Sequence, residues 1–358
     1  MKKSSVLPKF ELTSTEPLYR QIARHIRTHI LSGQIPVGTK LPSIRQLASE
    51  AGTSVFSIQK ALDPLFRDGL IGRNPRSGST SGTTVLSQKV KLTSIAVYFG
   101  NLIHSGEGQF YQALYSSIFQ QLIPRGVEVH LLTDHRKRNQ QGTPSKKLLQ
   151  AIQNHEIQAV IASMLYPSHF DWLRDLEVPV AMHASTSDPR CIRNDPQEFL
   201  LMALEQFQRR GVRRISLIPQ MIETQSETTA ESMGMEMVQL GKEELSKYQH
   251  TTWDQKGYQI FHEIWKQPRR PEGIFVYPDS SIPGIVYAIK ELGIRVPEEL
   301  KVIAHRNKGV NLFYPLKSDE IIMDIDEIAA RLIQTIDLQL MDQPLPVLHV
   351  SPLLKPGY

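Results

Sequence analysis

Two pairs of residues have spacings that chemistry could use. His25 and His29 are four residues apart, so a helix would place both side chains on one face. No acidic residue completes an H-E-x-x-H motif, so we predict two exposed helix residues and no zinc site. Asp324 and Asp326 could serve phosphoryl chemistry. Because they directly precede a predicted helix, capping that helix is the simpler prediction.

Other signatures of catalysis are incomplete. The stretch G-S-T-S-G at 78–82 has the outline of a nucleophile elbow, but its centre is Thr80 and no strand-to-helix turn surrounds it. Gly106 and Gly108 lack the third glycine of a dinucleotide-binding loop, and the chain contains no P-loop. Cys191, the only cysteine, has no disulfide partner, which predicts an inert thiol. We therefore expect no catalytic residues, no metal and no cofactor. An enzyme remains an alternative without a supporting motif.

The net charge of +5 over 358 residues is unevenly divided along the chain. Residues 1–91 hold fourteen Lys and Arg against five Asp and Glu, a net charge of +9, and the remainder holds 27 against 31, a net charge of −4. A small basic module on a larger acidic body suggests a reader of a polyanion joined to a second function. With one cysteine, no apolar run behind the first lysines and no long apolar segment, the sequence indicates a cytoplasmic protein without a membrane span.

The basic module has the pattern of three helices and a hairpin. Apolar residues recur every four positions from Leu18 to Ile30, with Thr15 as the expected start and Gly33 as the end. Ser43 and Gln46 form a capping-box pattern at the start of a second helix. A third helix is expected from Ser54 to Gly69, and strands at 70–71 and 83–85 enclose a basic tip. This pattern predicts a winged helix-turn-helix over residues 1–85, followed by a linker at 86–91.

From residue 92 the pattern changes to apolar strands that alternate with helical stretches. The expected helices cover 109–123, 145–154, 168–174, 196–209, 228–240, 256–265 and 282–292. Strands rich in Val and Ile between such helices predict parallel sheets covered on both faces. Two sheets fit residues 92–358 better than one wide sheet, so the fold class is multidomain, an α+β head on a two-lobed α/β body.

The stretch from Pro17 to Thr83 resembles the GntR family of bacterial winged-helix regulators. The residues PLYRQI, the run ILSGQIPVGTKLPSIRQLA and the run ALDPLFRDGLI follow that family's frame almost position for position. The resemblance implies a second-helix arginine that contacts DNA, here Arg45. Val55 and Gln59 stand where the family usually has arginines, so base preference is expected to differ.

The expected DNA interface lies at the start of the third helix, at the second helix and on the wing. There, hydroxyls meet phosphates and longer side chains reach base edges. The predicted DNA-binding residues are Ser43, Arg45, Thr53, Ser54, Phe56, Ser57, Gln59, Lys60, Arg73, Arg76 and Gly78.

Most of residues 92–353 resemble the LacI/GalR-type regulatory domain, which shares the type I periplasmic-binding-protein fold. The clearest passages are IRNDPQEFLLMALEQFQRRGVRRISLI and GYQIFHEIWKQPRRPEGIFVYPDSSIPGIVYAIKELGIRVPEELKVIAH. The resemblance implies one lobe from 92–194 with 309–342 and a second from 195–308 with 343–358. A ligand would sit between them at the carboxyl ends of the strands, and lobe closure would be the switch.

The sugar-binding residues implied by this resemblance are largely replaced. Ala184, Glu231, Pro278 and Arg306 stand where the family often has an aspartate, an arginine, an asparagine and an acidic residue. One hypothesis is that Glu231 and Arg306 form a reversed ion pair across the cleft; the alternative is that both lie on the surface. The predicted effector-binding residues are Phe110, Glu231, Trp253, Asp279, His305 and Arg306.

The sequence thus predicts a DNA-binding transcriptional regulator, a repressor and homodimer. It would bind an inverted-repeat operator in double-stranded DNA and respond to a small metabolite such as a sugar or sugar derivative. The alternative is a regulator whose body only dimerises and binds no ligand.

Overall fold

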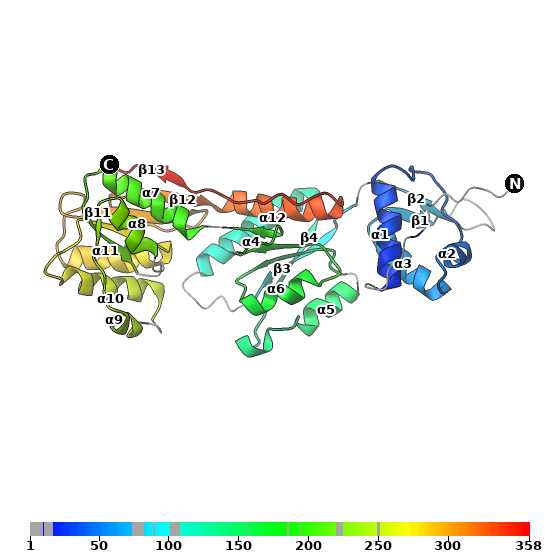
Figure 1. Cartoon of the computed structure of the whole chain (residues 1–358), viewed down its shortest axis with the longest axis horizontal. Helices are drawn as coiled ribbons and strands as arrows, with labels where there is room; N and C mark the ends of the chain where they lie inside the picture. The colour runs from blue at the N-terminus through cyan, green and yellow to red at the C-terminus, as the bar shows by residue number, and fades with distance from the viewer. Residues whose placement is uncertain are drawn as a thin grey trace.

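Three units follow one another along the long axis of the molecule (Figure 1). The computed structural model describes residues 10, 17–73, 82–88, 90–100, 108–154, 156–184, 186–193, 195–219, 225–248 and 251–358. A small N-terminal head lies at one end, a first α/β lobe lies in the middle, and a second α/β lobe lies at the other end.

The head is a winged helix with its own apolar core. Helix α1 buries Ile22, Ile26 and Ile30, as the four-residue spacing predicts. Its expected start at Thr15 lies outside the described residues. Strands β1 and β2 pair antiparallel, so the predicted wing base is confirmed. The elements are α1 (Leu18–Leu31), α2 (Ile44–Glu50), α3 (Val55–Arg67), β1 (Ile71–Arg73) and β2 (Thr83–Val85).

The first lobe is a sheet of five parallel strands in the order β4-β3-β5-β6-β7. All six residues of β3 are buried, because helices cover both faces: α4 and α12 on one, α5 and α6 on the other. The elements are β3 (Ser94–Phe99), α4 (Gly108–Leu122), η1 (Ile123–Arg125), β4 (Glu128–Thr133), η2 (Arg138–Gln140), α5 (Lys146–Gln153), β5 (Val160–Ser163), α6 (Pro167–Arg174), β6 (Val180–His183), β7 (Cys191–Ile192) and α12 (Ile325–Leu340).

The second lobe is a six-stranded sheet in the order β13-β12-β11-β10-β8-β9, parallel except for the β12–β13 pair. Helices α10 and α11 pack on one face and α7 on the other. The elements are α7 (Pro196–Arg209), β8 (Arg214–Ile218), α8 (Gln225–Ser232), β9 (Glu236–Met237), α9 (Lys242–Ser246), α10 (Trp253–Trp265), β10 (Gly273–Val276), η3 (Asp279–Ser281), α11 (Ile282–Glu291), β11 (Lys301–Lys308), β12 (Asp319–Asp324) and β13 (Leu353–Lys355).

Two details of the predicted body are wrong. Residues 309–342 were expected in the first lobe, but β12 pairs with β11 in the second sheet, so the chain returns to the first lobe only at α12. The helix expected over 228–240 ends at Ser232, because Gly234 adopts a φ of +76° and Glu236 then begins β9.

The predicted role of the aspartate pair before α12 is confirmed for Asp324. Its carboxylate accepts a hydrogen bond from the Asp326 amide, 3.0 Å away, and caps α12. Helix α12 then packs against α4 and β6 of the first lobe. One apolar cluster, which includes Phe99, Leu332 and Phe275, extends from the first lobe through α12 to the second.

Candidate nucleic-acid interface and effector cleft

Local hydrogen bonds fix the two helices of the helix-turn-helix. At α2, Ser43 Oγ accepts from the Gln46 amide at 3.3 Å, and the Ser43 amide donates to Gln46 Oε1 at 2.9 Å, which confirms the capping box. At α3, Ser54 Oγ accepts from the Ser57 amide at 3.0 Å. Ser43, Ser54 and Ser57 therefore position helix ends, and their oxygens already have partners within the head.

The two faces of α3 differ sharply in exposure. Its inner face buries Ile58, Ala61, Leu62 and Leu65. On the outer face Gln59 and Lys60 are exposed, and 73% of the Phe56 surface is accessible. A large apolar ring that is exposed between polar groups at the start of a recognition helix can contact a thymine methyl group.

The remaining predicted DNA-binding residues lie around this face. Arg45 on α2 is exposed, and Thr53 is half-buried before α3. Arg73 is exposed at the end of β1, with its guanidinium 6.0 Å from the centre of the Phe66 ring. Arg76 and Gly78 lie outside the described residues. Tyr19 of α1 was not among the predicted residues; its ring centre lies 4.0 Å from Lys60 Nζ.

The carboxyl edge of the first sheet places aromatic and polar groups together. His183 ends β6 and its Nδ1 lies 3.2 Å from Ser163 Oγ at the end of β5. Phe110 of α4 packs against the His183 ring at a centroid distance of 5.3 Å. The predicted residue Phe110 is therefore half-buried at this edge, beside two polar residues that the sequence analysis did not select.

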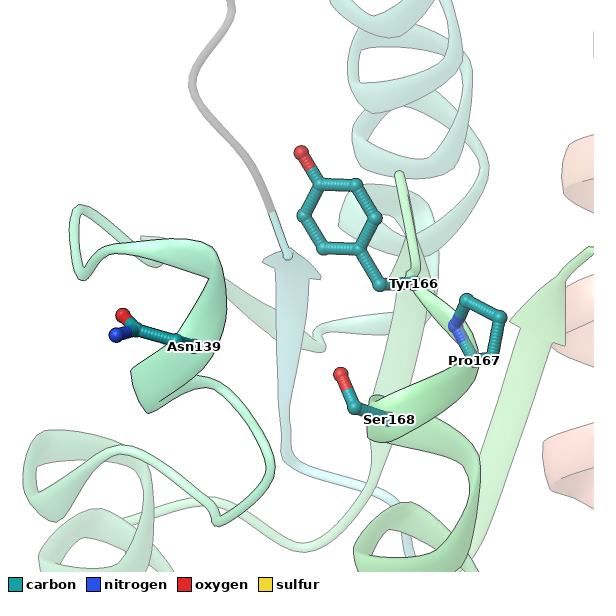
Figure 2. Close-up of a pocket in the computed structure, with 4 residues that line it drawn as sticks. All are labelled: Asn139, Tyr166, Pro167 and Ser168. Atoms are coloured by element: carbon teal, nitrogen blue, oxygen red, sulfur yellow. The ribbon is translucent and has the colours of Figure 1, made fainter.

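A hollow of about 680 Å³ opens at the same edge, between η2 and the start of α6 (Figure 2). Its lining includes an aromatic ring, a hydroxyl and an amide, on Tyr166, Ser168 and Asn139, together with Pro167. The sequence signal for it was weak, because these residues belong to two loops that only the fold brings together.

Both walls of this hollow are held by buried polar groups. Arg136 pairs with Asp134 and donates to the Gln140 and Thr143 carbonyls, which fixes the loop that carries Asn139. Burial of Asp134 opposes its ionisation, but hydrogen bonds from Arg136 and Tyr98 lower the pKa of its carboxyl to about 2. On the other wall, His169 Nδ1 accepts from the Tyr166 amide at 2.8 Å. The hollow is therefore preorganised.

At the carboxyl edge of the second sheet, Asp279 and His305 are bound to each other and to the backbone. The Asp279 amide donates to His305 Nδ1 at 3.2 Å, and Asp279 Oδ2 accepts from the Asn307 amide at 3.0 Å and from its side chain at 3.1 Å. Burial lowers the pKa of His305 to about 4. The charge of Asp279 opposes this shift, and the charge of Arg306 adds to it. Both predicted effector residues are buried and hold the loop after β10 in this conformation.

The hypothesis of an ion pair between Glu231 and Arg306 is wrong. Arg306 Nε lies 3.6 Å from Glu320 of the neighbouring strand β12, and its guanidinium donates to the Leu312 carbonyl at 2.8 Å. The parallel pairing of β11 and β12 sets Glu320 opposite Ala304, two residues before Arg306, so this carboxylate lies diagonally across the two strands from Arg306 and is its partner. Glu231 is exposed on α8.

Trp253, Tyr277 and Phe199 are further aromatic residues of the second lobe. Trp253 begins α10, half-buried, with Lys256 Nζ 4.6 Å from its ring centre. Tyr277 and Phe199 pack against His305 at centroid distances of 4.7 and 5.1 Å. These two aromatic residues were missed by the sequence analysis.

Among the described residues, the His, Cys, Asp and Glu side chains do not gather into a metal-binding cluster. No group of three or more His, Cys, Asp or Glu side chains there could hold a metal ion. The His25 and His29 rings are half-buried and not exposed as predicted, and they lie at a tilt of 41° with their centroids 4.3 Å apart. Cys191 is buried, and burial raises the pKa of its thiol. No helix in the described part of the chain is long and apolar enough to cross a membrane.

Fold and site together define a winged-helix head joined to a two-lobed α/β body. Residues 18–80 match the model of bacterial regulatory proteins of the gntR family, and residues 204–356 match the model of the periplasmic binding protein-like domain. The chain thus carries a GntR-type winged helix followed by a periplasmic binding protein-like domain.

Curated relatives match only short stretches. The uncharacterized HTH-type transcriptional regulator YdeL of Bacillus subtilis is 36% identical over 73 residues, which is 20% of this chain and 16% of YdeL. The HTH-type transcriptional repressor PurR of Photorhabdus laumondii is 38% identical over 62 residues, 17% of this chain and 18% of PurR. The chain spans less than a fifth of the length of these relatives.

Solved structures share the fold of the body. A LacI family transcriptional regulator from Arthrobacter sp. FB24, in complex with lactose, is 17% identical, with 74% of this chain and 99% of that chain covered and a TM-score of 0.54. The transcriptional regulator CelR in its complex with cellobiose is 14% identical, with 88% and 98% covered and a TM-score of 0.55. At these identities the likeness shows a LacI-like fold.

Proposed function

We propose that this chain is a DNA-binding transcriptional regulator whose head binds an operator. The observation that carries this proposal is the outer face of α3, which exposes Phe56, Gln59 and Lys60 on a winged helix while its inner face is packed. The net charge of +9 over residues 1–91 supports binding to a polyanion that weakens as salt rises.

The first test measures DNA binding by the full chain. Binding sites are selected from a random duplex library, and affinity for the enriched duplex is then measured by fluorescence anisotropy. We expect Arg45→Ala to weaken binding by about tenfold to a hundredfold, because a groove contact contributes about 1–3 kcal/mol. Lys242→Ala, which removes an exposed cation from α9 of the second lobe, is the control and leaves affinity unchanged. Absence of any enriched sequence contradicts the proposal.

The body is proposed to bind a small polar metabolite between its lobes. The carboxyl edges of both sheets supply aromatic and hydrogen-bonding groups, with Phe110 and Tyr166 on the first and Tyr277 on the second. Such a mixture suits a sugar or sugar derivative. Structures of similar fold hold lactose and cellobiose, which supports this ligand class.

A thermal-shift screen separates an effector-binding body from one that only dimerises. A ligand that binds the folded body raises its stability by about 2.7 kcal/mol at a hundredfold excess over Kd. We expect a member of a panel of sugars, sugar acids and sugar phosphates to raise the Tm, and Tyr166→Ala to reduce the shift. Tyr287→Ala, which removes an exposed ring from α11, is the control and should leave the Tm shift unchanged. If no compound of the panel raises the Tm, the alternative is favoured, namely a body that only dimerises.

We further propose a cytoplasmic homodimer that represses transcription. Two heads related by a two-fold axis would read an inverted repeat, and the PurR relatives are named as repressors. Sedimentation of the protein on a selected operator gives the stoichiometry, which we expect to be two chains per duplex. Reporter expression from that operator gives the sign of regulation.

A further inference from the structure

Helix α1 of the head contacts the first lobe at two places. Near its start, Arg20 forms an ion pair with Glu177, and Tyr19 Oη donates to Glu177 Oε1 at 3.1 Å. Two turns further on, Thr28 Oγ1 donates to Asp342 Oδ2 at 3.0 Å. The two contacts are eight residues apart, about 12 Å along the helix axis. They fix the orientation of the head on the end of the first lobe, where Figure 1 shows α1 and α3 facing the body.

The contact at Glu177 places two donors and one further positive charge of the head around one carboxylate. Besides Tyr19 and Arg20, Lys60 of α3 lies nearby, with Nζ 4.0 Å from the centre of the Tyr19 ring. Burial of Glu177 favours its neutral form, but the hydrogen bond and charge of Arg20, with Tyr19 and Lys60, hold the pKa of this carboxyl below its ordinary value. Glu177 is thus an anion bound in a site formed by the head.

A hydroxyl, a guanidinium and an ammonium group are also the donors that proteins use to bind DNA phosphates. Lys60 stands on the exposed face of the recognition helix, so this anion site directly flanks the face proposed to enter the groove. We propose that Tyr19, Arg20 and Lys60 form a binding site for a phosphodiester of the DNA backbone, and that Glu177 of the body occupies this site in the present conformation. The body and DNA then compete for the head. This inference rests on the proposed function, because it assumes that the head binds DNA.

The competition is tested on the full chain with a fluorescein-labelled 30-base-pair duplex of mixed sequence, whose binding depends on phosphate contacts. Glu177→Gln removes the charge of the competing carboxylate. We expect this variant to bind the duplex about threefold to fivefold more tightly than the wild type, because an exposed ion pair contributes up to about this factor. The gain should shrink as salt is raised.

Asp175→Asn is the matched control. Asp175 is exposed two residues from Glu177, and its replacement removes the same formal charge from the same end of the body. None of the head contacts described above involves Asp175. We expect the affinity of Asp175→Asn for the duplex to equal that of the wild type within error. A gain in affinity for both Asp175→Asn and Glu177→Gln would indicate general electrostatic repulsion and overturn the proposed competition.

A second variant tests the phosphate site itself. In the Glu177→Gln background, where Arg20 is released, Arg20→Gln should weaken duplex binding and reduce the slope of log affinity against log salt by about one. An unchanged slope overturns the site. Circular dichroism and the unfolding midpoint show that each variant is folded. If the wild-type chain binds no duplex, the proposed function fails; if it binds and Glu177→Gln behaves like the wild type, only this inference fails.

Discussion

Individual buried groups of the body set how its stability responds to pH. His305 is 5% exposed, its Nδ1 accepts a hydrogen bond, and its pKa is lowered to about 4 by burial. In the unfolded chain a histidine titrates near 6.5. Between about pH 6.5 and 4 the unfolded chain therefore binds a proton that the native protein does not bind. The free energy of unfolding falls as pH is lowered through this window.

We expect His305→Gln to reduce this pH dependence, because glutamine can accept the same hydrogen bond without titrating. Up to roughly 3 kcal/mol of stability would be lost in the wild type between pH 6.5 and 4 and retained in the variant. Urea unfolding of the second lobe, measured across this range, gives the difference. His349→Gln alters an exposed histidine and serves as the control. If the free energy of unfolding falls with pH equally in the wild type and in His305→Gln, His305 is not the cause of the pH dependence.

A second residue with a large expected effect is Asp68 in the head. Asp68 is 3% exposed; its carboxylate pairs with Arg27, and its carbonyl accepts a hydrogen bond from the Lys91 amide of the linker. Asp68→Ala leaves the half-buried Arg27 without this carboxylate, so we expect a loss of about 3 kcal/mol in head stability. The midpoint of the head transition in thermal unfolding measures it. Asp63→Ala, which truncates an exposed aspartate on α3, should have a much smaller effect.

At the scale of the elements, short helices depend on their ends. Helix α2 has seven residues and buries only Leu47 and Ala48, so its capping box supplies a large share of its stability. We expect Ser43→Ala to destabilise the head by about 1 kcal/mol. Ser49→Ala, near the other end of α2, changes stability little. Thermal unfolding of the two variants compares them, and equal midpoints would mean that the cap contributes nothing.

The elements of the head were predictable because their signals are local. The four-residue spacing of α1 and the caps at Ser43 and Ser54 involve residues within one or two turns. The exposed face of α3 follows from the same periodicity. Ser43 was predicted both as a helix cap and as a DNA-binding residue; its cap is present, and its contact with DNA stays a prediction.

The cleft was predicted less well because its geometry depends on distant pairings. The partner of Arg306 is decided by the register of β11 and β12, which pairs Glu320 with Ala304 and so brings its carboxylate diagonally within reach of Arg306. Likewise the hollow beside Tyr166 and the contact of Arg20 with Glu177 join segments far apart in sequence. Apolar alternation identifies strands, but it does not identify which polar side chains meet at their ends.

At the scale of the whole molecule, the first lobe has an apolar surface on α4 and the edge strand β4. Phe119, Ile123 and Leu131 are exposed on α4, on η1 and on β4, and these elements are adjacent. Exposed apolar groups beside an unpaired strand edge favour contact with another chain. This surface is where we place the contact of the proposed homodimer.

We expect Phe119→Asp to convert the proposed dimer to a monomer, because the contact would then bury a charge against apolar side chains. Size-exclusion chromatography with light scattering measures the mass of each variant. Leu292→Asp places the same charge at an exposed apolar position of the second lobe and should leave the dimer intact. A wild-type chain of monomeric mass, or a dimeric Phe119→Asp, would contradict this placement.

Helix α12 runs from the second lobe, along the first lobe, to the contact with the head. It begins at Asp324, where β12 of the second lobe ends, packs along the first lobe, and ends beside Asp342, which contacts Thr28 of the head. Its sixteen residues make a rod about 24 Å long. If closure of the lobes rotated the first lobe, and α12 with it, by about 10°, the far end of this helix would move by about 4 Å. The helix would then act as a lever arm that turns a small rotation near the ligand into a displacement at the recognition helix.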